Sequence, residues 1–166
     1  MKKHLLLSVS ALGLGLVACE KADEKVKNYV VPAPITATFN QDYDLNYQQV
    51  ARLPTTATPE LTVELADLQY TYCPADGCSS NPSLRCVVGT DVSPNLTVTD
   101  ATGQVQQVRL PANSPAAGSP AWRDTTSIRA NGQRYVLYYV KWKMLRCDPA
   151  KYDFSVVLRV SKPTTK

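Results

Sequence analysis

The chain has 166 residues, 44% of them hydrophobic and 19% charged, which is the composition of a folded protein and excludes a disordered or collagen-like chain. Its 18 basic and 14 acidic residues give a net charge of +4, too little for a nucleic-acid-binding protein. The one histidine, His4, lies in a segment that we expect to be removed, which excludes the common imidazole-based active sites from the mature protein.

Residues 1–18 have the pattern of a cleaved export signal. Two lysines precede an apolar run from Leu5 to Val17, which is too short to span a bilayer as a stable helix. The run ends in Leu16-Val17-Ala18-Cys19, which resembles the lipobox of bacterial lipoproteins. In that class a diacylglyceryl group is placed on the cysteine thiol, signal peptidase II cuts before the cysteine, and the new amino group is acylated, commonly with palmitate. We therefore expect Cys19 to be the lipidated first residue; an ordinary secretory signal is the alternative.

Residues 19–38 are predicted to be an extended tether. Six charges of mixed sign lie between Glu20 and Lys27, and Pro32 and Pro34 favour extended backbone. The residue after Cys19 is Glu20 and not the Asp that retains some lipoproteins in the inner membrane, so we expect the outer membrane of a cell envelope. The folded domain is expected to span residues 39–166.

From Phe39 onward, apolar and polar residues alternate with period two, which is typical of strands with one dry face. No window of about 11 residues after the signal keeps a helical period, so an all-β fold is predicted. The apolar set shifts phase between Leu65 and Leu68, which predicts a β-bulge near Leu65–Asp67. We expect an immunoglobulin-like antiparallel β-sandwich of seven or eight strands, with strands at 43–53, 61–72, 96–98, 105–110, 134–147 and 154–160.

Two alternating sets of residues in the longest predicted strand are both largely apolar. We expect the set of Val136, Tyr138, Val140, Trp142 and Met144 to face the core. The other set is either covered in part by a neighbouring loop, with its lysines reaching solvent, or forms a ligand-binding face rich in aromatic residues and lysine; it contains Tyr135, Leu137, Tyr139, Lys141, Lys143 and Leu145.

The connection Pro111–Thr126 is unusually long and contains Trp122 and Arg123 near its end. In one interpretation, Trp122 folds back as a lid over the end of the sandwich. In the other, the connection is an exposed recognition loop in which Trp122 and Arg123 contact a partner.

The mature chain has four cysteines besides Cys19, an even number in a protein expected to be exported, which predicts two disulfides with three permitted connectivities. Their spacing lacks the paired short knuckles of a zinc site, so we expect no metal and no cofactor. The four are Cys73, Cys78, Cys86 and Cys147.

Several segments resemble a group of small, uncharacterised bacterial lipoproteins. They include Tyr43–Ala51, Tyr72-Cys73-Pro74, Cys86-Val-Val-Gly89 and the closing segment Tyr152–Lys162. The resemblance implies a β-sandwich with a C-P…C-x-x-G disulfide corner, here Cys73 with Cys86, which leaves Cys78 for Cys147. The chain departs from the group's pattern by an insert, Ala75–Arg85, that carries Cys78.

The function expected from these features is that of a membrane-tethered, non-enzymatic binding or structural module, with a protein or glycan of the cell envelope as partner. The alternative is an immunoglobulin-fold protease inhibitor, because Pro54-Thr55-Thr56 and Pro120-Ala121-Trp122 faintly resemble two loop motifs of such inhibitors. An inhibitor would need both loops at one end of the sandwich. A carboxylate-based hydrolase using Asp76, Asp91 or Asp124 is the least favoured class.

Overall fold

The computed structural model describes residues 29–54, 58–75, 78, 86–110 and 122–162. Over these residues the chain forms nine strands and one short 3-10 turn. The elements are β1 (Ile35–Thr36), β2 (Asp42–Asn46), β3 (Val50–Leu53), β4 (Leu61–Thr71), β5 (Asp91–Asp100), β6 (Val105–Arg109), β7 (Asp124–Ala130), β8 (Gln133–Met144), the 3-10 turn Lys151–Asp153 and β9 (Phe154–Ser161).

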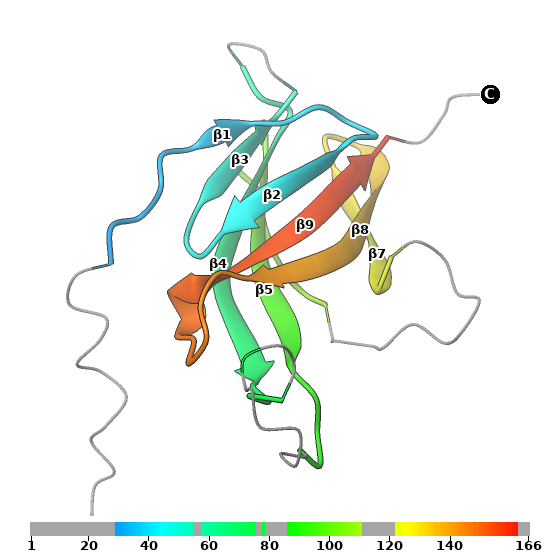
Figure 1. Cartoon of the computed structure of the whole chain (residues 1–166). Coiled ribbons are helices and arrows are strands. Elements are labelled where there is room, and N and C mark those ends of the chain that lie inside the picture. The colour runs from blue at the N-terminus through cyan, green and yellow to red at the C-terminus, as the bar shows by residue number, and fades with distance from the viewer. Residues whose placement is uncertain (1–28, 55–57, 76–77, 79–85, 111–121, 163–166) are drawn as a thin grey trace, which may run out of the picture.

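The strands make two sheets (Figure 1). Sheet A has the order β1-β3-β4-β5-β6, and sheet B has the order β2-β9-β8-β7. Neighbouring strands are antiparallel except β1 and β3, which are parallel. The strands β3 to β6 follow one another as a meander, as do β7 to β9. The predicted all-β, sandwich-like architecture of two sheets is therefore confirmed. The expected number of strands and the purely antiparallel pairing were wrong, because the described residues form nine strands and β1 is parallel to β3. The single strand expected at 43–53 is two strands, β2 and β3, which belong to different sheets.

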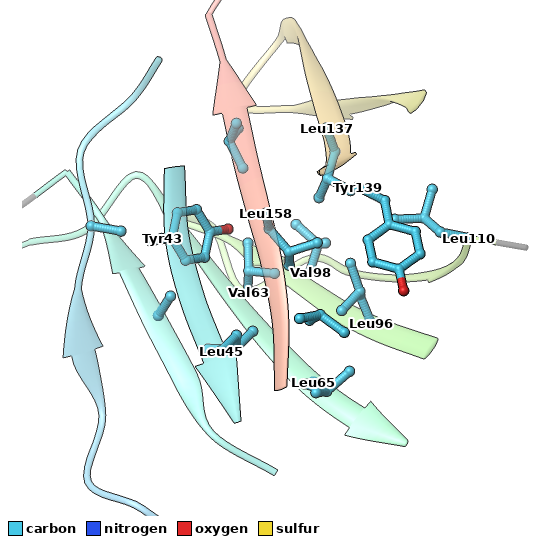
Figure 2. Close-up of a cluster of buried hydrophobic side chains, with 14 of the residues drawn as sticks. Tyr43, Leu45, Val63, Leu65, Leu96, Val98, Leu110, Leu137, Tyr139 and Leu158 are labelled. Atoms are coloured by element: carbon cyan, nitrogen blue, oxygen red, sulfur yellow. The ribbon is translucent and has the colours of Figure 1, made fainter. Parts of the chain in front are cut away.

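The core lies between the two sheets and receives every second residue of most strands. The alternation is clearest in β5, where Val92, Leu96 and Val98 are buried and their neighbours are partly exposed. Figure 2 shows side chains of both sheets meeting in this core, among them Leu45, Leu65, Leu96, Leu137 and Leu158. Removal of these apolar side chains from water is the main contribution that stabilises the fold.

The predicted β-bulge in β4 is confirmed. The pairing of β4 with β5 shifts register between Leu65 and Asp67, so Ala66 has no partner residue in the ladder. Leu65 before the bulge and Leu68 after it are both fully buried. The extra residue therefore keeps both halves of the strand facing the core.

A second bulge lies at Val140 in β8, and it corrects the expected core face of that strand. The pairing of β8 with β9 shifts register between Tyr139 and Lys141. Before the shift, the core residues are Tyr135, Leu137 and Tyr139, all fully buried, whereas Val136 and Tyr138 face outward and are half-buried. The expectation was wrong for this half of the strand because both sets of residues are apolar, and register against β9 decides which set is buried. After the shift, Trp142 and Met144 pack against the core, as predicted.

The outer face of sheet B is covered by charged side chains. Lys143 Nζ lies 2.6 Å from the Asp44 carboxylate, and Arg159 Nε lies 2.7 Å from that of Asp42. Because β9 separates β2 from β8, the Lys143 side chain must cross β9 to reach its partner. Val157 faces outward on β9 and is nevertheless only 4% exposed. The long stems of such side chains can cover apolar surface while their charged ends stay in water.

One end of the sandwich, which we call the hairpin end, holds the turns Asp100–Gly103 and Asn131–Gly132. The Asp100 carboxylate accepts hydrogen bonds from Thr102 Oγ1 at 2.6 Å and from the backbone N–H of Asn131 at 3.2 Å. These bonds hold the pKa of Asp100 below its usual value, with the Thr102 hydroxyl as the largest cause. Since Asp100 belongs to sheet A and Asn131 follows a strand of sheet B, this network joins the two sheets.

The domain begins earlier than expected, because residues 29–38 lie against it. Ile35 and Thr36 form β1 and pair with Ala51 and Arg52 of β3. Ala37 is 5% exposed and belongs to the core. The predicted tether, residues 19–38, thus contains a short edge strand. The sequence does not reveal this strand, because two residues are too few to show an alternating pattern.

We predict that Leu137→Ala lowers the free energy of unfolding by about 2 to 5 kcal/mol, because it opens a cavity in the core. The adjacent change Val136→Ala removes a half-exposed side chain and should cost under about 1 kcal/mol. Urea denaturation of the two variants measures both values. Equal costs, or a larger cost for Val136→Ala, would contradict the observed register of β8.

Candidate functional site

The end of the sandwich opposite the hairpin end carries all four cysteines that pair, and we call it the disulfide end. Cys73 is bonded to Cys86, with Cα atoms 5.8 Å apart, and Cys78 is bonded to Cys147, with Cα atoms 5.4 Å apart. Both pairings agree with the expected ones. The first bridge links the chain after β4 to the segment before β5, and the second links that region to the chain after β8. The second bridge therefore joins sheet A to sheet B.

An aromatic cluster closes the space between the sheets at the disulfide end. The Phe154 ring has its centroid 4.8 Å from that of Tyr70 and 6.2 Å from that of Trp142. The Tyr70 hydroxyl donates a hydrogen bond of 2.9 Å to the Pro149 carbonyl, which fixes the loop between β8 and β9. Tyr70 lies beyond the bulge of β4 and Trp142 beyond the bulge of β8, so both bulges turn an aromatic ring toward this cluster.

Arg123 is held on top of the cluster and is not free to contact a partner. Its guanidinium lies 2.6 Å from the Asp91 carboxylate and 5.6 Å from the centre of the Trp142 ring. Its backbone N–H donates a hydrogen bond of 2.7 Å to the Tyr139 carbonyl. This arrangement fixes the start of β7 to β8, and it places Arg123 between the two sheets near the disulfide end.

Trp122 lies on the outer face of sheet B. Its ring meets that of Tyr138 edge to face, with centroids 5.0 Å apart. Arg123 instead contacts Asp91 of sheet A, so the two members of the predicted pair lie on opposite faces of sheet B. Trp122 is half-buried against β8 and does not form a lid over the end of the sandwich. The rest of the long connection, residues 111–121, lies outside the described residues.

A shallow hollow of about 390 Å³ opens beside the aromatic cluster. It is lined by the last residues of β4, the first residues of β5 and the segment between them. Its lining combines hydrogen-bonding side chains with one aromatic ring and one valine, a set that can hold a polar chain such as a peptide or glycan. The lining residues are Gln69, Tyr70, Thr71, Val88, Asp91 and Ser93.

In the described part of the chain, the carboxylates considered for catalysis do not face each other as an acid/base pair. The Asp91 carboxylate forms its ion pair with Arg123, and the Asp124 carboxylate accepts a hydrogen bond from the backbone N–H of Thr125. Asp76 lies outside the described residues. Within the described ranges no group of three or more histidine, cysteine, aspartate or glutamate residues could hold a metal ion.

The described residues of the two segments that resemble inhibitor motifs, Pro54 and Trp122, lie at opposite ends of the sandwich. Leu53, next to Pro54, pairs with Leu61 at the start of β4, which is the hairpin end. Arg123, next to Trp122, contacts Asp91 at the start of β5, which is the disulfide end. Because β4 and β5 run between these ends over about ten residues, roughly 30 Å of strand separates the two sites.

Two features of this site were missed in the sequence. The Asn131-Gly132 pair has φ angles of 52° and 70°, which fit a two-residue type I′ hairpin turn. That pair is a signal for the hairpin β7–β8, and it would have shown that Asp124–Ala130 is a strand that holds Arg123 in place. The aromatic cluster has no comparable signal, because it depends on the bulge in β8.

Among the described residues, no helix is long and apolar enough to cross a membrane. Comparison of the chain with protein families, curated proteins and solved structures gave no match.

We predict that the two disulfides contribute unequally to stability. The Cys78–Cys147 bridge spans a sequence separation of 69 and the Cys73–Cys86 bridge one of 13. From loop entropy alone, replacing Cys78 and Cys147 by alanine should lower the free energy of unfolding by about 4 kcal/mol. Replacing Cys73 and Cys86 by alanine should lower it by about 3 kcal/mol. Chemical denaturation of the two double variants measures the difference, and a clearly larger loss for Cys73→Ala/Cys86→Ala would contradict loop length as the factor that ranks the two bridges.

Proposed function

We propose that the protein is a bacterial lipoprotein held in the cell envelope, in the outer membrane, by lipid on Cys19, and that its sandwich is a non-enzymatic binding or structural module. The observation that carries this proposal is the lipobox-like Leu16–Cys19 directly after a short apolar run. Two or three acyl chains at one cysteine would hold a protein on a membrane without a transmembrane helix. The resemblance to small uncharacterised lipoproteins points in the same direction and adds no activity.

The two disulfides support a location outside the cytoplasm. Disulfides persist in oxidising compartments such as the periplasm and the cell surface, and are rare in the cytosol. Cys73 is 2% exposed, and its backbone N–H donates a hydrogen bond of 2.9 Å to Thr90 Oγ1. The bridge at this residue is thus built into the end of the core, which fits a chain that folds where thiols are oxidised.

The hollow at the disulfide end is the surface on which we place the binding role. Its amide and hydroxyl groups can exchange hydrogen bonds with a polar chain, and the Tyr70 ring, 36% exposed, offers a face for stacking. The Asp91 carboxylate is neutralised in place by Arg123, so the hollow presents a fixed ion pair and not a free charge. A protein segment or glycan of the cell envelope is the partner class that this lining suits.

The inhibitor alternative receives no support from this geometry. Its two loop motifs would have to act together, whereas Pro54 and Trp122 lie at opposite ends of the sandwich. An immunoglobulin-like relationship stays a prediction; the meander of β3 to β6 replaces the Greek-key order expected of that fold.

Mass spectrometry of the protein expressed in a Gram-negative host tests the proposal. We predict a mature chain that begins at Cys19, carries a diacylglyceryl group and an amide-linked acyl chain, and contains two disulfides. Cys19→Ser should yield an unlipidated chain that keeps residues 1–18, because the cysteine thiol is both the lipid acceptor and the residue before which the signal is cut.

Ala22→Ser is the matched control, since it changes a nearby small residue and keeps the thiol. It should behave as the unchanged protein. An unlipidated mature protein, or a Cys19→Ser variant that is still cut before residue 19, would contradict lipid anchoring at this residue.

A further inference from the structure

The direction of β1 shows where the chain enters the domain. β3 runs from Val50, opposite Glu64, to Leu53, opposite Leu61 at the hairpin end. β1 is parallel to β3 and therefore also runs toward the hairpin end (Figure 1). The residues before Ile35 must consequently lie toward the disulfide end.

Contacts of Tyr29 fix this entry point. The Tyr29 hydroxyl donates a hydrogen bond of 2.6 Å to the Tyr47 carbonyl, and its ring stacks on that of Tyr152 with centroids 5.2 Å apart. Tyr152 lies in the 3-10 turn of the loop that Cys147 bridges to sheet A. The first described residue of the chain is thus fastened to the loop between β8 and β9, which carries Cys147. The C-terminal strand β9 ends at the other side, where Lys162 forms an ion pair with Glu60.

Exposed apolar side chains collect at the same end. Val87 is fully exposed, Val88 is 61% exposed and Leu145 is 63% exposed, and all three adjoin a bridged cysteine or the hollow. Val30 lies next to Tyr29 and is 83% exposed. Val105 on β6 is also exposed, but it pairs with Thr99 near the hairpin end.

Tyrosines gather around the loop that carries Leu145 and Cys147. Five of the nine tyrosines in the chain lie in or beside the loop between β8 and β9, or contact a tyrosine that does. Tyrosine rings are amphipathic and are enriched where a protein meets the interface of a bilayer. The five are Tyr29, Tyr47, Tyr70, Tyr72 and Tyr152.

The length of the tether favours an orientation with the entry point toward the bilayer. Nine residues lie between Cys19 and Tyr29, which is ten residue-to-residue steps (29 − 19 = 10); this gives a span of at most about 35 Å when fully extended and about 17 Å as a flexible coil. The strand β4 alone has 11 residues, a length of about 36 Å. A lipid at Cys19 thus keeps the disulfide end nearer to the bilayer than the hairpin end.

We infer that the disulfide end is a membrane-docking surface, on which Val87, Val88 and Leu145 enter the interfacial region of the bilayer that holds the lipid on Cys19. This inference rests on the proposed lipid anchor. Charged residues nearby are paired, as in Lys151 with Asp67 at 2.6 Å and Arg123 with Asp91 at 2.6 Å. These ion pairs carry no net charge, so docking on the bilayer should not require anionic lipid.

Tryptophan quenching by brominated lipid tests this inference. The full chain is expressed in a Gram-negative host, purified in its lipidated form and reconstituted in phosphatidylcholine vesicles with or without bromine on the acyl chains. Leu145→Trp places an indole at the disulfide end, and Val105→Trp is the matched control at the other end. Quenching of Leu145→Trp should exceed that of the unchanged protein by roughly twofold or more, because apolar side chains of a docked surface enter the boundary of headgroups and acyl chains.

Val105→Trp should be quenched no more than the unchanged protein, and Val88→Trp is a second probe of the disulfide end if Leu145→Trp does not fold. Equal quenching at the two ends in a lipidated protein would overturn the docking surface and leave the anchor intact, as expected for a surface that binds a protein or a second copy. Absence of lipid on Cys19 would overturn both proposals.

Discussion

The parallel pairing of β1 with β3 is the constraint on which the functional account depends. Two residues, Ile35 and Thr36, are enough to set the direction in which the chain joins sheet A. Tyr29 then fastens the preceding segment beside the loop of Cys147 through its hydrogen bond and its stacked ring. An anchor attached ahead of this segment acts on one end of the sandwich. The segment that the sequence predicts to be a tether would thus orient the domain relative to a membrane that holds its anchor.

Three kinds of interaction coincide at the disulfide end. The Cys78–Cys147 bridge joins the sheets covalently, the rings of Tyr70, Trp142 and Phe154 fill the space between them, and Arg123 covers the cluster and forms an ion pair with Asp91. These interactions hold both sheets together beside the exposed valines and leucine. In the proposed arrangement the hollow would lie close to the bilayer, so that a partner would reach it along the membrane surface.

Sequence patterns predicted the strands that have one apolar and one polar face. They did not predict which residues are buried where both faces of a strand are apolar. In β4, leucines alternate with polar residues, so the phase shift that marks the bulge is visible. In β8, Tyr135, Leu137 and Tyr139 alternate with Val136, Tyr138 and Val140, and only pairing with β9 shows which set is buried. The edge strand β1 has too few residues for a period. Trp122 and Arg123 lie just before β7 and outside its ladder, so strand alternation does not predict that Trp122 packs on Tyr138 while Arg123 reaches Asp91.

In the proposed arrangement, the lipid on Cys19 holds the domain with its disulfide end against the bilayer. Neutron reflectometry of the lipidated protein on a supported phosphatidylcholine bilayer measures the distance between the headgroups and the protein layer. A docked domain should give a protein layer in direct contact with the headgroups. A water-filled layer of roughly 17 Å or more between them, the reach of a free ten-residue tether, would contradict it.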